Sequence, residues 1–319
     1  MQKRYEDMAE IDIRNLNLAA KENPAALIRI AEERYHEKIK EIASVAKEHS
    51  DLRAILLAGP SGSGKTTTAN LLADAIKNLG EDAMVLSLDD FYRAADDPEY
   101  PKLPSGERDF ESPYALHLSD LIGTLEKITA GEPFLCPKYD FKSASRKEEY
   151  IHPAMPDGCV IIEGLHALNP VIYEKLPKDK ILKLFVSVST NVNDGEERII
   201  SGRKLRFIRR MVRDSIYRGA DAARTLSMWH GVIDGEDKYL YPYKSLADVA
   251  FDTFHDFELG VMKAPAEKLL SEGDVPEDYI IDTVKNALSA ALEIDDSLVP
   301  KSSLMREFIS GGIYHEIYG

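Results

Sequence analysis

Residues 59–66 read Gly59-Pro60-Ser61-Gly62-Ser63-Gly64-Lys65-Thr66, and this octapeptide decides the predicted fold. It matches the pattern G-x-x-x-x-G-K-[ST] at every fixed position. Glycines let consecutive main-chain amides turn toward one anion without a clash at Cβ. A helix that opens near Lys65 would add the positive end of its dipole. The octapeptide therefore predicts a nucleotide phosphate loop, in which Lys65 reaches the β- and γ-phosphates of ATP and Thr66 ligates Mg²⁺. The next residue, Thr67, is assigned to the same nucleotide site.

The surrounding segments alternate between strand and helix patterns. An all-apolar run at 54–58 precedes the octapeptide and a helical pattern at 64–79 follows it. Further strands are predicted at 83–88, 160–162 and 181–188, and further helices at 115–129, 203–217 and 276–292. Such alternation predicts an α/β protein of the P-loop NTPase fold, with a mostly parallel sheet flanked by helices. The stretch 96–112 is rich in proline and acidic residues and predicts a loop.

Three regions are expected along the chain. Residues 1–50 predict a helical N-terminal extension, because apolar residues recur there at helical spacing from Leu27 to Val45. Residues 51–295 form the P-loop domain. Residues 296–319 form a C-terminal tail that packs on that domain.

Composition excludes several classes of protein. The formal charge of −15 opposes nucleic-acid binding, because an acidic chain gains nothing from counterion release. The two cysteines, Cys136 and Cys159, have no metal-ligand spacing and are expected to be ordinary reduced thiols. No apolar run approaches the roughly 20 residues of a membrane span. We therefore expect a soluble, cytoplasmic protein that binds neither nucleic acid nor membrane.

Acidic residues follow two of the predicted strands. Glu163 closes the strand at 160–162, and Asp89 and Asp90 close the strand at 83–88. The carboxyl ends of parallel strands share one edge of a sheet, where ligands bind. Carboxylates there could hold Mg²⁺ through water or accept a proton from a hydroxyl group.

A basic cluster interrupts the otherwise acidic chain. Six basic residues crowd into positions 203–213, and four of them share one helical face: Arg206, Arg209, Arg210 and Arg213. Like charges at this spacing repel each other by a few tenths of a kcal/mol per pair, which a shared anion would relieve. We interpret this segment as a lid helix that brings Arg209, Arg210 and Arg213 over the transferring phosphate.

Two other nucleotide-binding patterns are disfavoured. No Asn in the chain is followed by Lys, so the NKxD signature of guanine recognition is absent. The triplet at 310–312, Ser-Gly-Gly, faintly resembles a transporter-ATPase signature, but no strand-end acid follows it. We interpret it as a glycine turn.

With these motifs in order, the segment from about Arg53 to about Leu270 resembles the uridine kinase / phosphoribulokinase family of P-loop kinases, in a bacterial uridine-kinase-like subgroup. The resemblance rests on the octapeptide and on segments 87–93 (SLDDFYR), 109–113 (DFESP), 138–141 (KYDF), 163–166 (EGLH) and 206–219. It implies that Asp89 is the catalytic base and that Glu163 and Asp89 lie near the metal. It also implies that the acceptor is contacted by six residues: Asp90, Tyr92, Glu111, Tyr139, Arg206 and Arg218.

One position departs from the family pattern. The family usually carries a pyrimidine-contacting His five residues after the pocket Tyr, and Ala144 occupies that position here. An alanine side chain neither donates nor accepts a hydrogen bond. The base of the acceptor therefore stays open.

The resulting prediction is an ATP- and Mg²⁺-dependent phosphotransferase acting on an alcohol. The expected acceptor is a small molecule, in the first place the ribose 5′-hydroxyl of uridine or cytidine. A kinase of another acceptor, phosphoribulokinase-like or pantothenate-kinase-like, and a nucleotide-binding regulator with little turnover both remain alternatives. A homo-oligomer is an open option.

Overall fold

The central sheet consists of parallel strands. The computed structural model describes residues 4–5, 9–140, 143–272 and 274–314. Within them, six strands form the sheet in the order β1 (Arg4–Tyr5), β11 (Val249–Asp252), β8 (Ile181–Ser187), β3 (Ala54–Ala58), β7 (Cys159–Glu163) and β4 (Ala83–Ser87). Every neighbouring pair is parallel. The predicted α/β fold and its four predicted strands are confirmed.

Both faces of this sheet are covered, which explains the unbroken apolar runs. In β3, Ile55 and Leu57 enter one apolar core, whereas Ala54, Leu56 and Ala58 enter the other. A strand that is buried on both sides cannot alternate between polar and apolar residues.

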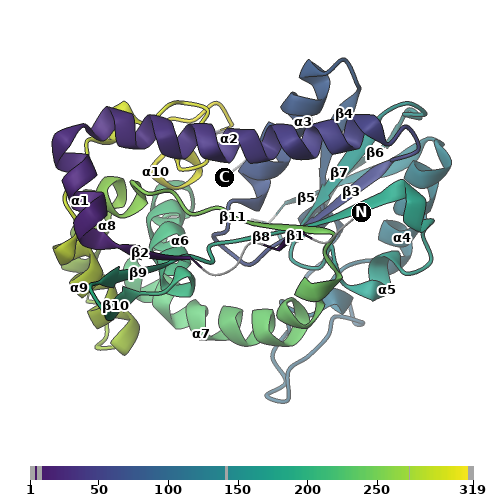
Figure 1. The fold of residues 1–319 in the computed structure, drawn as a ribbon. Coiled ribbons are helices and arrows are strands. Elements are labelled where there is room, and N and C mark those ends of the chain that lie inside the picture. The colour runs from purple at the N-terminus through teal and green to yellow at the C-terminus, as the bar shows by residue number, and fades with distance from the viewer. Residues whose placement is uncertain (1–3, 6–8, 141–142, 273, 315–319) are drawn as a thin grey trace.

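Ten helices lie around the sheet in the described residues. They are α1 (Ile13–Glu22), α2 (Pro24–Glu48), α3 (Lys65–Asn78), α4 (Leu118–Ala130), α5 (Pro170–Tyr173), α6 (Gly202–Arg218), α7 (Ala222–Tyr239), α8 (Glu258–Glu272), α9 (Tyr279–Ala290) and α10 (Arg306–Ile309). The helices predicted at 64–79, 115–129, 203–217 and 276–292 correspond to α3, α4, α6 and α9. In Figure 1, α2 is a long helix that runs across the top of the view, with the yellow C-terminal tail beneath it.

Smaller strands complete the molecule. A three-stranded sheet contains β10 (Glu197–Ile200), β9 (Asn191–Asp194) and β2 (Glu10–Asp12), and an antiparallel hairpin contains β5 (Phe134–Asp140) and β6 (Ser145–His152). The polar, exposed β6 gave no strand signal in the sequence. Residues 96–112 form the expected loop.

The N-terminal segment is not wholly helical, which corrects our expectation for residues 1–50. β1 extends the central sheet beside β11, and β2 pairs with β9. The predicted helical periodicity does hold for α2, whose buried residues include Ile28, Tyr35 and Ile39. Asn23 caps α2 with a side-chain hydrogen bond from the Ala26 amide.

The N-terminal and C-terminal segments share the core of the P-loop domain. Tyr35 on α2 shares a 2.7 Å hydrogen bond with Thr68 on α3. Leu304, Met305 and Phe308 from the tail are fully buried in the same apolar core. Residues near both ends of the chain thus pack around the first turn of α3.

Candidate active site

The octapeptide connects the carboxyl end of β3 to the first turn of α3. Gly62 and Gly64 adopt φ values of +73° and +81°, which favour glycine. A Cβ added at Gly59 would lie only 2.2 Å from the Val186 carbonyl oxygen. The glycines are therefore required by this loop conformation, which leads directly into the N-terminus of α3, a favourable place for an anion.

Lys65 and Thr66 open α3 beside a buried acid. The Lys65 ammonium donates to the Pro60 carbonyl at 3.1 Å. The Thr66 hydroxyl donates to Glu163 Oε1 at 3.5 Å, and Ser87 donates to the same oxygen at 2.9 Å. Three of the predicted residues thus meet at the carboxyl edge of the sheet.

Asp89 stands next to this group, in a 3-10 turn (Leu88–Phe91) that follows β4. Its amide donates to Ser87 Oγ at 3.3 Å, so the turn is tied to the end of the strand. The side chain keeps solvent exposure, yet the surrounding protein removes enough hydration to raise the pKa of Asp89. Lys65 gives the largest opposing effect, followed by Arg218. Cations from the loop and from α6 therefore face this carboxylate.

Glu163 is the second perturbed carboxyl. Burial raises the pKa of Glu163 to about 7, and the neighbouring charge of Asp89 acts in the same direction. Lys65 opposes both effects. A cation bound here would restore the charged form, so the site suits a cationic ligand.

Glu111 lies in the loop before the 3-10 turn Pro113–Ala115. Its side chain packs on α7, where a Cβ added at Gly235 would lie 2.4 Å from Glu111 Cβ. Burial raises the pKa of Glu111 to about 7, and Arg210 is the strongest opposing charge. The Asp89 charge also acts on Glu111, which puts the two predicted acids near each other.

Tyr92 and Tyr139, both predicted to contact the acceptor, lie near each other. The rings of Tyr92 and Tyr139 lie 5.9 Å apart. The Tyr92 hydroxyl donates to the Phe110 carbonyl at 3.2 Å, and the Tyr139 hydroxyl donates to the Arg93 carbonyl at 3.2 Å. Burial raises the pKa of Tyr92, with Asp89 as the next contribution.

Asp90 is bonded within the protein, and its assignment as a substrate-binding residue stays a prediction. The side chain is buried, and Oδ2 accepts from the Lys138 ammonium at 2.7 Å. Oδ1 accepts from the Tyr139 amide at 3.2 Å. Asp90 therefore joins the turn after β4 to strand β5.

Arg206 and Arg209 are corrected. Both side chains are fully buried, and each pairs with a buried glutamate, Arg206 with Glu236 and Arg209 with Glu258. Arg206 donates to the Ser61 carbonyl at 2.7 Å. Because both guanidinium groups are committed to protein partners, they brace the phosphate loop rather than meet a substrate.

Arg210, Arg213 and Arg218 remain as candidates for anion contact. All three pair with Asp214, at 3.2, 2.7 and 3.5 Å. Arg210 also donates to the Ser61 hydroxyl at 2.9 Å, and the Arg218 side chain is 53% exposed. This half of α6 keeps the predicted concentration of positive charge beside the loop.

Thr67 has a partner far away in the sequence. Its side chain is fully buried, and its hydroxyl donates to Glu307 in the C-terminal tail, 240 positions away, at 2.7 Å. The assignment of Thr67 to the nucleotide site stays a prediction.

No motif marks the residues that support the phosphate loop from the side of the core. Glu236 accepts from the Ser61 amide at 2.9 Å, and Thr253 donates to the Ser63 carbonyl at 2.8 Å. Both lie in stretches without a recognisable motif. His166, quoted with the strand-end motif but given no role, is buried beside Tyr239, and burial lowers its pKa to about 3.

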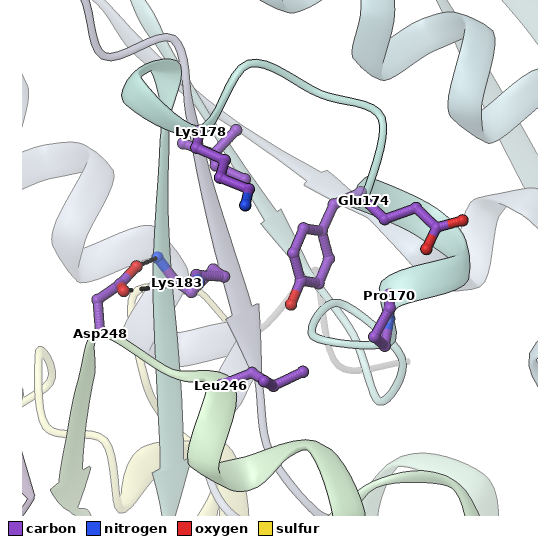
Figure 2. A pocket seen from close by; sticks show the side chains of 8 residues that line it. Pro170, Glu174, Lys178, Lys183, Leu246 and Asp248 are labelled. Carbon is purple, nitrogen blue, oxygen red and sulfur yellow. Dashed lines mark hydrogen bonds and ion pairs between the residues drawn. The ribbon is translucent and has the colours of Figure 1, made fainter.

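A pocket lies away from these residues. A pocket of about 480 Å³ is lined by residues of α5, the start of β8 and the segment before β11. Figure 2 shows Lys183 joined to Asp248 there, with Lys178 and Glu174 at the rim. Because Ile181 and Lys183 lie at the beginning of β8, this pocket is remote from the carboxyl edge of the sheet.

The described parts of the chain contain neither a metal-binding cluster of side chains nor a membrane-spanning helix. In the described parts of the chain, no group of three or more His, Cys, Asp or Glu could hold a metal ion by itself. Mg²⁺ bound mainly through phosphate oxygens needs no such group. Among the helices described, none combines the length and the apolar character that a bilayer crossing requires.

The phosphate loop, the parallel sheet and the strand-end acids define a P-loop protein of the kinase class. The sequence model of the Phosphoribulokinase / Uridine kinase family matches residues 54–259, more than half of the chain. The chain belongs to this family, which confirms the resemblance found in the sequence.

Individual relatives are distant. "Uridine-cytidine kinase-like 1" of Mus musculus is 28% identical over 198 residues, which cover 61% of this chain and 32% of that protein. A "Uridine kinase" of Lactobacillus helveticus is 29% identical over 194 residues, which cover 60% of this chain and 82% of that protein. The first of these matches therefore spans about a third of its relative's length.

One solved structure is similar at a low level. "Structure of a Possible Uridine Kinase from Bacillus stearothermophilus" is 17% identical, with a TM-score of 0.48, and the match covers 69% of this chain and 100% of that one. No functional weight attaches to a likeness of this size.

Proposed function

We propose that this chain transfers the γ-phosphate of ATP to a primary hydroxyl group of a ribose-containing small molecule, in the first place uridine or cytidine. The observation that carries the proposal is the position of Asp89. It follows β4 and is tied to Ser87, while Lys65, Arg218 and Arg213 act on its charge and Asp89 in turn acts on Glu111. A base must stand where the acceptor meets the phosphate, and these neighbours support that role for Asp89.

Separate groups of residues bind the phosphates, accept the proton and balance the negative charge. Main-chain amides of residues 59–66 and the Lys65 ammonium hold the phosphates. Asp89 accepts the proton of the attacking hydroxyl, a role typically worth about 10²–10⁴ in rate. Arg210, Arg213 and Arg218 balance the negative charge on the transferring group, since Arg210 donates to Ser61 of the phosphate loop and Arg213 and Arg218 act on the Asp89 charge.

The acceptor is bound by Glu111, Tyr92 and Tyr139. The half-buried Glu111 can bind ribose hydroxyls, because a carboxyl group accepts two hydrogen bonds at once. The tilted pair of tyrosine rings offers an apolar wall for the rest of the acceptor.

The residues present also fit a magnesium ion. Thr66 and Glu163 bring oxygen atoms to 3.5 Å from each other beside the phosphate loop, and burial raises the pKa of Glu163 even though the Lys65 charge opposes that shift. When bound, Mg²⁺ would neutralise charge on the phosphates. Asp89 would hold the ion through water, as the family resemblance implies.

The test is an acceptor panel with ADP release as the readout. Uridine and cytidine should stimulate ADP release strongly, whereas ribulose 5-phosphate and pantothenate should not. Stimulation by one of the last two alone would replace the nucleoside proposal with the related-kinase alternative. That alternative draws support from Ala144, which lies in the β5–β6 turn and supplies no side-chain hydrogen bond.

The regulator alternative makes a different prediction. Such a protein would bind ATP but would release no ADP in response to any acceptor. Its motivation is again the absence of the pocket His. A cytoplasmic location and a homo-oligomer also stay predictions.

A further inference from the structure

The C-terminal tail touches the phosphate loop from the side of the core. A Cβ added at Gly64 would lie 2.5 Å from Leu304 Cδ1, so Leu304 packs directly on the loop. The centroid of the Phe308 ring lies 5.1 Å from Cζ of Arg209. The Arg209 guanidinium in turn donates to the Gly62 carbonyl. The family model ends at residue 259, so these contacts come from outside the matched region.

Glu307 is the polar member of this contact. Its side chain is only 5% exposed. Oε2 accepts from the Thr67 hydroxyl at 2.7 Å, and Oε1 lies 3.7 Å from an Arg213 guanidinium nitrogen. One buried carboxylate therefore joins the first turn of α3 to α6.

Glu307 carries a buried charge, and a buried charge requires stabilising partners. A carboxylate taken out of water destabilises a protein unless charged and hydrogen-bonding partners replace its hydration. Both kinds of partner are present, and both belong to the proposed site: Thr67 follows the phosphate loop, and Arg213 is one of the cations that face Asp89. Arg213 is held by Asp214 on one side and by Glu307 on the other.

We propose that Glu307 is a positioning residue, which fixes Arg213 and the Thr67 hydroxyl relative to each other so that the phosphate loop and α6 act on one triphosphate. The proposal rests on the proposed function, and it makes the C-terminal tail a working part of the nucleotide site. The two carboxylate oxygens of Glu307 contact different residues, so loss of each contact should have a separate effect.

The two effects can be separated by two substitutions. Glu307→Gln keeps the shape and an oxygen that accepts from Thr67, but it removes the charge that faces Arg213. We expect kcat to fall roughly tenfold, with ATP affinity changed less than about threefold. Glu307→Ala removes both contacts, so ATP affinity should fall roughly tenfold as well.

The matched control is Arg306→Gln. Arg306 binds the carbonyls of Asp296, Val299 and Ser310 within the tail, so its loss should lower thermal stability without a change in kcat or ATP affinity. ATP affinity is measured by calorimetry with Mg²⁺ and no acceptor, and kcat by ADP release, both well below the unfolding temperature of each variant.

Two results would overturn the inference: a Glu307→Gln kcat within twofold of wild type, or an equal loss of kcat in Arg306→Gln. Failure of the proposed function would look different, because the wild-type protein would then show no acceptor-stimulated turnover. In that case the calorimetric comparison of Glu307→Ala with wild type still tests whether the tail shapes the nucleotide site, and equal affinities would overturn it.

Discussion

Replacement of Asp89 by Asn separates nucleotide binding from chemistry. Asn has nearly the same shape, so the 3-10 turn and its link to Ser87 should persist. The amide cannot accept the proton of the attacking hydroxyl at neutral pH. A general base is typically worth about 10²–10⁴ in rate, and we expect kcat to fall by that factor, which corresponds to about 3–5 kcal/mol of transition-state stabilisation.

The surroundings of Asp89 also predict the effect on ATP. Lys65, Arg218 and Arg213 all stabilise the Asp89 charge in the wild-type protein. Its removal leaves these cations with one fewer anion, so ATP affinity should stay the same or increase slightly. The assay combines ADP release at saturating acceptor with calorimetry of Mg²⁺–ATP binding.

Asp90→Asn serves as the control. Asp90 is tied to Lys138 and to the Tyr139 amide, so its replacement should lower stability more than it lowers kcat. If Asp89→Asn retains turnover within about fivefold of wild type, Asp89 is not the base. A larger loss of kcat in Asp90→Asn would transfer that role to Asp90.

Three further predictions concern the scaffold. Gly59→Ala forces a Cβ to 2.2 Å from a strand carbonyl and should destabilise the protein by about 1–3 kcal/mol in urea unfolding. The control is Gly123→Ala, which has no neighbour near its new Cβ and should be neutral or stabilising. Equal unfolding midpoints of the two variants would contradict this prediction. Glu236→Gln leaves Arg206 buried without its ion pair and should cost about 3–5 kcal/mol of unfolding free energy, while a loss below 1 kcal/mol would show that the pair is not needed. Burial raises the pKa of Glu32 to about 7, above its ordinary value of 4.5. Between these two pH values the folded state keeps a proton on Glu32 that the unfolded state has lost. The free energy of unfolding of the wild-type protein should therefore fall by about 2–3 kcal/mol as pH rises from 4.5 through 7. Glu32→Gln should lose this component of the pH dependence, and identical slopes of unfolding free energy against pH would refute the assignment.

The sequence predicted four of the six strands of the sheet, because each of these four carries its own apolar signal. Residues 54–58 are an unbroken apolar run, and residues 181–187 are apolar except for Lys183 and Ser187, which favours a strand buried on both faces. β6 is polar and exposed, and it is a strand only because β5 lies beside it. β1 likewise depends on pairing with β11, a partner more than 240 residues away that no local pattern reveals.

The site was predictable where chemistry imposes a motif. The phosphate loop joins a buried strand to a helix and Glu163 ends a strand, as their spacing predicted, whereas the roles of Asp89, Glu163 and Glu111 stay predictions. Arg206 and Arg209 were misassigned because helical periodicity shows which residues share a face, but it does not show whether that face meets solvent or a buried glutamate. Glu236 and Glu307 act through tertiary contacts alone, so nothing near them in the sequence marks them.

Thermal unfolding with and without Mg²⁺–ATP tests the central claim most directly. At ATP concentrations about a hundredfold above the dissociation constant, binding adds about 2.7 kcal/mol, and the unfolding temperature should rise by roughly 5 °C or more. Lys65→Ala should lose most of this rise, because its ammonium no longer meets the phosphates. Equal unfolding temperatures with and without nucleotide, or an undiminished rise in Lys65→Ala, would contradict the claim that this loop holds a triphosphate.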